Sequence, residues 1–117
     1  MNKSTLVLGA SAKPWRYSFQ AVNRLREKGH TTLGLGRTAA DVAGVKIAAE
    51  ETELDLPEDI DTITVYLNPD RQAEYYDWVI AQKPKRVILN PGAENEAIAR
   101  LLRVSGIEVE NACTLVL

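Results

Sequence analysis

The sequence has few of the residues from which disulfides, metal sites and acid–base catalysts are usually built. Its 117 residues include one cysteine, Cys113, and one histidine, His30. A single cysteine excludes an internal disulfide and a zinc site made of several cysteines. Such low cysteine usage is typical of a reducing compartment, so we expect a cytoplasmic protein.

Long hydrophobic runs and an excess of charge of one sign are also missing. No apolar run approaches the ~20 residues that a membrane helix needs. The four apolar or small residues at 6–9 are too few for a signal peptide. With 14 basic and 16 acidic residues, the formal charge is −2. We therefore expect no membrane insertion and no nucleic-acid binding, which needs a basic field.

The sequence does contain a regular alternation of short apolar runs with amphipathic stretches, which is typical of strands connected by helices. A short polar bridge follows residue 36, and residues 44–48 form either a brief strand or a turn. The predicted strands cover residues 5–9, 31–36, 61–67, 86–89 and 107–110, and the predicted helices cover residues 18–28, 69–82 and 94–105. This pattern predicts one α/β domain over residues 1–117, three-layered and Rossmann-like, with a mainly parallel sheet of about five strands.

In open parallel sheets, ligands bind at the carboxyl ends of the strands. The first such loop, residues 9–18, lies where a dinucleotide fold keeps its phosphate-binding turn, but only Gly9 remains of the glycine pattern. A helix N-terminus attracts phosphate, Ser11 offers a hydroxyl, and Lys13 and Arg16 offer charge. Trp15 and Tyr17 are packing candidates that can also cover an adenine. The alternative is an ordinary loop with solvated cations.

The later loops carry further candidates. At the end of the second strand, Arg37 replaces the carboxylate that an NAD site needs, and an arginine there suits a ribose phosphate, as in NADP or coenzyme A. Asn68 and Pro69 are typical of a helix start and can also wall a nucleotide. Gly92 permits close approach of a ligand. Because neither Gly92 nor Ala93 can cap the next helix, we expect its amide groups to be available.

Three motifs in this order carry a resemblance to a known family. They are Gly9-Ala-Ser11 followed by Pro14 and Arg16-Tyr-Ser18, then Asn90-Pro-Gly-Ala93, then Asn111-Ala-Cys-Thr114. The chain resembles, over nearly its whole length, the small stand-alone CoA-binding domain proteins, which are related to the nucleotide-binding domain of the succinyl-CoA synthetase alpha subunit.

The resemblance implies a Rossmann-like domain that binds coenzyme A or an acyl-CoA. Many members of that family have Val-Asn-Pro after the second strand, where this chain has Leu35-Gly36-Arg37. The contacts drawn from the loops and from the resemblance together are Gly9, Ala10, Ser11, Lys13, Pro14, Arg16, Tyr17, Ser18, Arg37, Asn68, Pro69, Pro91 and Gly92.

Residues suited to catalysis are scarce. His30 lies between a helix end and a strand start, which places it at the edge opposite the predicted site. Cys113 lies on the ligand side, but no second histidine can act as its base, and a buried apolar cysteine is the commoner outcome. The acidic residues between 50 and 61 lack the spacing of a metal site and indicate a solvated loop. The sequence therefore favours a binding protein over an enzyme.

The favoured function is a small non-catalytic module that binds coenzyme A or an acyl-CoA as a sensor or carrier. Two other functions stay open. One is a subunit or interaction protein with a vestigial nucleotide site, whose interface to a partner or a second copy would be marked by exposed Trp78 or residues 115–117. The other is an NADP-binding enzyme or regulator.

Overall fold

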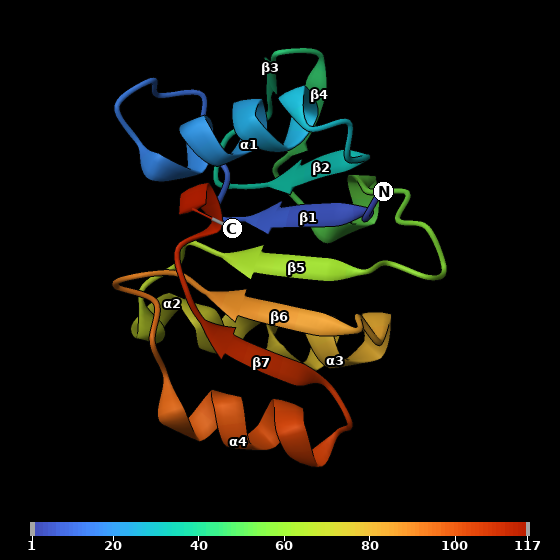
Figure 1. Ribbon diagram of the computed structural model, residues 1–117, viewed down its shortest axis with the longest axis vertical. Helices are drawn as coiled ribbons and strands as arrows, with labels where there is room; N and C mark the ends of the chain where they lie inside the picture. Colours follow the sequence, from blue (N-terminus) through green and yellow to red (C-terminus); the bar gives the residue numbers. More distant parts are fainter. Residues whose placement is uncertain (1, 117) are drawn as a thin grey trace.

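A single twisted sheet forms the centre of the protein, as seen in the computed structural model, which describes residues 2–116 (Figure 1). Its strand order is β3-β4-β2-β1-β5-β6-β7. All neighbouring strands pair in parallel except β3 and β4. The strands are β1 (Thr5–Leu8), β2 (Thr32–Leu35), β3 (Ala40–Val42), β4 (Val45–Ala48), β5 (Thr62–Val65), β6 (Arg86–Leu89) and β7 (Glu108–Asn111).

Helices cover both faces of the sheet, which gives the three layers that the sequence predicts. Helix α1 lies on one face and helix α3 on the other, with α4 beyond the β7 edge (Figure 1). The helices are α1 (Tyr17–Glu27), α2 (Pro69–Gln72), α3 (Tyr76–Gln82) and α4 (Glu96–Val104), with short 3-10 segments η1 (Glu51–Glu53), η2 (Ala73–Tyr75) and η3 (Thr114–Val116). None of the helices in the described part of the chain is long and apolar enough to span a membrane.

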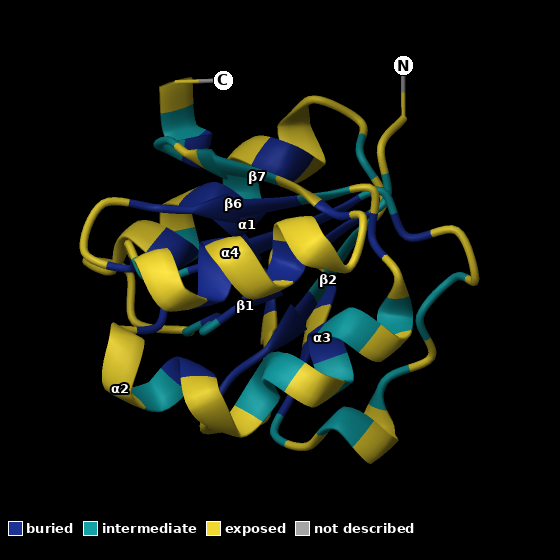
Figure 2. Cartoon of the chain, turned by 90° about the horizontal axis from the view of Figure 1, so that it is seen from below, coloured by how far each residue is buried: buried dark blue, intermediate teal, exposed yellow. Residues whose placement is uncertain are grey.

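Strand alternation divides the buried side chains into two clusters. On β1, Leu6 and Leu8 join the cluster that contains Val79 of α3 and Leu102 of α4, whereas Val7 joins the cluster beneath α1. The strands are dark with buried residues and the outer helix faces are exposed (Figure 2). Because β1 is buried on both faces, its run of consecutive apolar residues is the expected pattern for a central parallel strand.

The polar bridge after residue 36 contains a strand that the sequence analysis missed. Strands β3 and β4 form an antiparallel hairpin, so the sheet has seven strands instead of about five. Ala43 (φ +52°) and Gly44 (φ +80°) both adopt left-handed backbone, as a tight two-residue hairpin turn requires. The carboxylate of Asp41 accepts a hydrogen bond from the amide of Gly44.

The predicted continuous helix over residues 69–82 is wrong, because the chain forms α2, η2 and α3 in succession. The buried residue of α2 is a polar one, Gln72, which is 1% exposed. Its amide donates to the carbonyl oxygens of Leu67 (2.9 Å) and Ala93 (2.6 Å). Trp78 is also half-buried against the core, so the expected exposed interface residue at this position is wrong. Residue 117 lies outside the described residues.

Candidate functional site

A cavity of about 430 Å³ opens at the carboxyl ends of β1, β2 and β5. The strand order places β2, β4 and β3 on one side of β1 and β5, β6 and β7 on the other. The chain direction across the sheet therefore reverses beside β1, which is where such folds bind ligands. The walls are residues 9–13 with Arg16, residues 35–38 with Ala40, and residues 66–68 with Arg71 and Tyr75.

Glycine allows the first two walls to approach each other closely. The amides of Gly9 and Ala10 both donate to the carbonyl oxygen of Leu35. A Cβ on Gly36 would lie 2.1 Å from the carbonyl oxygen of Ala10, so no other residue fits there without movement of the backbone. Gly9 itself has φ +92°, a conformation that glycine adopts at little cost. At position 36 this chain departs from the pattern of the resembling family, and the close Ala10 carbonyl oxygen explains why a glycine is needed there.

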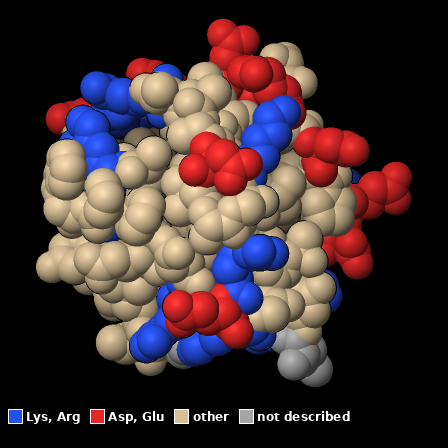
Figure 3. Space-filling model, turned by 90° about the horizontal axis from the view of Figure 1, so that it is seen from above, with Lys and Arg blue, Asp and Glu red and all other residues tan. Residues whose placement is uncertain are grey.

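Four cations surround the cavity: Lys13, Arg16, Arg37 and Arg71. No aspartate or glutamate lines it, and neither of the two ion pairs between described residues involves these cations. Arg71 is half-buried, whereas the other three are exposed. Seen from above, a group of basic side chains lies at the upper left, on the side where the strands end in Figure 1, and acidic side chains follow the right-hand side (Figure 3). The cavity is thus electropositive in a chain of slightly negative net charge.

The loop before α1 offers further groups to an anion. Arg16 is the N-cap residue of α1, and no side chain accepts from the first amides of this helix. Within the loop, the amide of Lys13 donates to the Ser11 hydroxyl and the amide of Arg16 donates to the Lys13 carbonyl oxygen. The carbonyl oxygen of Arg16 accepts from the amides of Phe19 and Gln20 in α1. Trp15 and Tyr17 are 72% and 69% exposed. The helix N-terminus and Lys13 can therefore receive a phosphate without first losing internal partners.

The structure brings together seven of the residues proposed from the sequence: Gly9, Ala10, Ser11, Lys13, Arg16, Arg37 and Asn68 all line the cavity. Six others lie outside its walls, namely Pro14, Tyr17, Ser18, Pro69, Pro91 and Gly92. Ser18 is buried, whereas the remaining five are exposed. A role in binding stays a prediction for all thirteen residues.

The turn at residues 90–95 differs from its prediction in one respect. Helix α4 begins at Glu96 and is capped by Asn95, whose side chain accepts from the amide of Ile98. The expectation of uncapped amides at this helix is therefore wrong, because the helix and its cap begin two residues later than the sequence analysis placed them. The amide of Gly92 is also occupied, since it donates to the carboxylate of Glu94 at 2.7 Å.

In the third wall of the cavity, sequence reasoning found Asn68 but missed Arg71 and Tyr75. Arg71 and Tyr75 lie one helical turn apart after the Asn68 cap, and both line the cavity. The side chain of Asn68 accepts from the amide of Arg71, as expected for an N-cap. The spacing of residues 68, 71 and 75 carries the signal, because an N-cap and the positions three and seven residues later share one side of a helix start.

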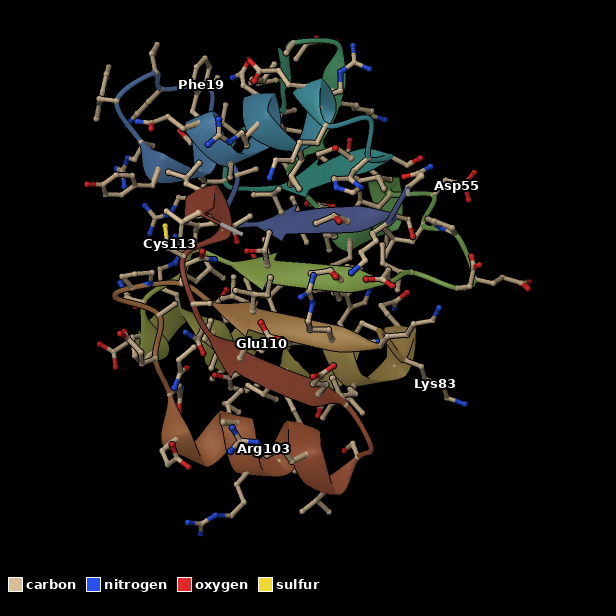
Figure 4. The ribbon with its side chains drawn as sticks, viewed as in Figure 1. Phe19, Asp55, Lys83, Arg103, Glu110 and Cys113 are labelled. Carbon is tan, nitrogen blue, oxygen red and sulfur yellow. The ribbon has the colours of Figure 1, made fainter. Side chains whose placement is uncertain are left out.

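A buried polar network closes the sheet beside the cavity. Asn90 donates to Thr64 (2.7 Å) and accepts from the amide of Thr114 (2.9 Å), and the Thr64 and Thr114 hydroxyls share a hydrogen bond. Tyr66 is next to this network, and burial raises its pKa to about 12. Half-buried Cys113 lies at the same edge of the sheet (Figure 4). Since the phenol stays neutral at physiological pH, it cannot act there as a base.

His30 lies at the other end of the strands, as predicted. Its Nδ1 accepts a hydrogen bond from the amide of Lys3, two residues before β1 begins. Burial and the nearby charges of Lys28 and Lys3 lower its pKa. Among residues 2–116 no group of three histidine, cysteine or acidic side chains is placed to hold a metal ion. Asp55, in the acidic connecting segment, lies at the edge opposite Cys113 (Figure 4).

Several solved structures share this fold. A crystal structure described as that of an uncharacterized protein has 41% sequence identity and a TM-score of 0.92, with 99% of this chain and 93% of that chain covered. A protein from Thermus thermophilus, cell-free ID.343, has 26% identity and a TM-score of 0.88, with 98% and 87% covered.

A larger protein contains a similar domain. The acetyl-coenzyme A synthetase 1 of Ca. Korarchaeum cryptofilum matches at 20% identity with a TM-score of 0.74, over 95% of this chain but 26% of that chain. No curated protein matches the sequence. The family model of the CoA binding domain matches residues 3–117, which is nearly the whole sequence. The chain therefore belongs to the CoA-binding domain family.

Proposed function

We propose that the protein binds coenzyme A or an acyl-CoA in the cavity at the carboxyl ends of β1, β2 and β5. One observation carries the proposal: four cations from three separate walls surround this cavity, and no carboxylate of the described residues lines it. Coenzyme A presents a diphosphate and a ribose phosphate, so it can satisfy cations on more than one wall. Membership of the CoA-binding domain family supports the same ligand.

We further propose that the module acts by binding and not by catalysis. The histidine lies at the opposite end of the strands, and the Tyr66 phenol beside Cys113 has a pKa raised to about 12. Neither group can therefore activate the Cys113 thiol or a water at the cavity near neutral pH. A bound coenzyme would then act as a signal or a handle for another protein.

Calorimetry and thermal unfolding with coenzyme A, acetyl-CoA, NADP and NAD test the proposal. A ligand at about 100 times its dissociation constant stabilises the fold by about 2.7 kcal/mol, which raises the melting temperature by roughly 10 °C or more for a domain of this size. We expect this shift with coenzyme A and acetyl-CoA. Binding of NADP alone would favour the alternative of an NADP-binding enzyme or regulator.

Incubation with acetyl-CoA tests the non-catalytic part of the proposal. We expect no thioester cleavage above the uncatalysed rate. Cleavage that disappears in Cys113→Ser would contradict this part and would identify Cys113 as a nucleophile.

A further inference from the structure

One of the cavity cations differs from the other three in its surroundings. Arg71 is half-buried, whereas Lys13, Arg16 and Arg37 are exposed. No carboxylate lies beside Arg71 in the cavity, and no hydrogen bond of its guanidinium to another described residue is present. A partly desolvated guanidinium without an anionic partner is unfavourable. Arg71 is therefore the cavity cation that gains most from an anionic ligand.

The local structure holds Arg71 toward the cavity. Its backbone amide is fixed by the Asn68 cap at 3.1 Å. The next residue, Gln72, is anchored in the core by its bonds to Leu67 and Ala93. Adjacent residues of a helix point about 100° apart, so an inward Gln72 leaves Arg71 on the cavity side. The backbone thus directs Arg71 toward the cavity without a hydrogen bond of its guanidinium to another described residue.

Arg71 and Arg37 lie on opposite walls of the cavity. Arg37 follows β2 and Arg71 follows β5, and these strands flank β1 on its two sides. Neighbouring strands are about 4.8 Å apart, so the ends of β2 and β5 are separated by roughly 10 Å. The backbone of Gly9 and Ala10 lies between them. Coenzyme A carries its ribose phosphate and its diphosphate at separate positions, so each wall can serve a different group of this ligand.

Resting on the proposed function, we propose that the cavity consists of two half-sites. The wall at Arg37 takes the ribose phosphate of the nucleotide. The wall at Arg71 takes the phosphate that carries the pantetheine arm, with Asn68 and Tyr75 beside it. The amide nitrogen of Asn68 and the hydroxyl of Tyr75 form no hydrogen bond to the described residues, so both remain available to this group. The half-site at Arg71 then binds 4′-phosphopantetheine compounds without the nucleotide.

This arrangement makes Arg71 the residue on which affinity for the pantetheine half depends most. A guanidinium can hold a phosphate through two parallel hydrogen bonds, which a lysine cannot reproduce. Hydrogen bonds to a charged group, partly shielded from water, typically change binding by about ten- to hundredfold. An exposed arginine at the opposite wall has a weaker effect because solvent screens it.

The two halves of coenzyme A can be tested separately by calorimetry. The probes are coenzyme A, 4′-phosphopantetheine and adenosine 3′,5′-bisphosphate. The proteins are the wild type, Arg71→Gln, Arg71→Lys, Arg37→Gln and, as a matched control, Arg100→Gln in α4, where Arg100 is exposed and does not line this cavity. Arg71→Gln removes no hydrogen bond of the fold, so its melting temperature without ligand should match that of the control.

We expect Arg71→Gln to weaken coenzyme A and 4′-phosphopantetheine about ten- to hundredfold and the bisphosphate less than about threefold. Arg71→Lys should restore part of the loss, and Arg37→Gln should show the reverse pattern. Equal losses for both half-ligands in Arg71→Gln would overturn the proposal of two half-sites. If the wild type binds coenzyme A but not 4′-phosphopantetheine, the half-site is likewise refuted while the proposed function stands. Binding of 4′-phosphopantetheine without coenzyme A would instead refute the proposed function and support the half-site.

Discussion

Single small residues decide whether the cavity can form. Gly34 and Gly36 bring β2 and its following loop against Ala10 of the first loop. A Cβ on Gly34 would meet mainly the Ile47 side chain, at 2.9 Å, whereas a Cβ on Gly36 would meet the Ala10 carbonyl oxygen at 2.1 Å. A side chain can shift by a small rotation, but a backbone carbonyl moves only with its whole loop. The two glycines are therefore not equivalent.

Gly36→Ala should separate the two loops, because the added methyl and the Ala10 carbonyl cannot occupy the same space. We expect a loss of stability of about 1–3 kcal/mol, as for other overpacked sites, together with weaker binding of coenzyme A. Gly34→Ala should cost less. Urea denaturation of both variants and calorimetry of each with coenzyme A measure these effects. Equal stability of the two variants would contradict this, because it would show that the loop containing Ala10 can move away from the added methyl group without cost.

For single residues, the sequence predicts roles that depend on near neighbours in the chain, but it does not predict contacts between residues far apart in the chain. Asn68 caps its helix as predicted, since a cap depends on residues within one turn. The clash that requires Gly36 is invisible in the sequence, because Ala10 lies 26 positions away and meets it only after β1 and β2 pair. Arg71 was missed for a similar reason, since its spacing from the Asn68 cap indicates a cavity wall only once Asn68 is known to line the cavity.

The segment from α2 to α3 is fixed by polar contacts more than by apolar ones. Gln72 links Leu67, two residues after β5, to Ala93, in the loop before α4. The Tyr76 hydroxyl donates to Gln72 and accepts from Asn95, so the two loops are held by one connected set of hydrogen bonds. Burial raises the pKa of Tyr76 to about 12, which keeps its proton in this network.

Gln72→Ala should therefore loosen α2 and the loop before α4 together. Two buried carbonyl oxygens would lose their donor, and we expect a loss of about 1–3 kcal/mol in the free energy of unfolding. Gln20→Ala, at an exposed position of α1, is the control and should change stability by less than about 0.5 kcal/mol. If the two variants unfold at the same urea concentration, Gln72 has no such linking role.

Helices and strands with a clear pattern of apolar residues are predicted from the sequence, whereas elements that depend on a buried polar side chain are not. The five strands expected from apolar runs all exist, because consecutive buried residues on a central strand leave a clear pattern. The broken helix after Asn68 follows from a buried glutamine, which a pattern of apolar spacing cannot register. Strand β3 was missed because it has three residues, of which Asp41 is exposed.

For the whole molecule, the distribution of charge matters more than its sum. The formal charge is −2, with 14 basic and 16 acidic residues. Four of the basic residues line the cavity, which leaves ten against 16 acidic residues over the rest of the chain. An anionic ligand is thus repelled by most of the surface and attracted at one end of the sheet, which is an arrangement that guides association.

Affinity for coenzyme A should consequently fall as salt is added. We expect several-fold weaker binding at 0.5 M than at 0.05 M NaCl, estimated from Debye lengths of about 4 and 14 Å. Arg37→Gln should show a smaller dependence on salt, because one exposed cavity cation is gone. Titration calorimetry across this range tests the expectation. A salt-independent affinity would mean that exposed cavity cations contribute little to binding.

The buried network around Asn90 has a consequence for how the sheet opens to water. Thr64 and Asn90 are buried and depend on Thr114, which follows β7, and Arg24 of α1 donates to the carbonyl oxygen of Leu115. A local opening of residues 112–116 would therefore admit water to the end of the sheet that adjoins the cavity while the strands stay paired. Hydrogen exchange at this end of the sheet thus reports on the docking of Thr114.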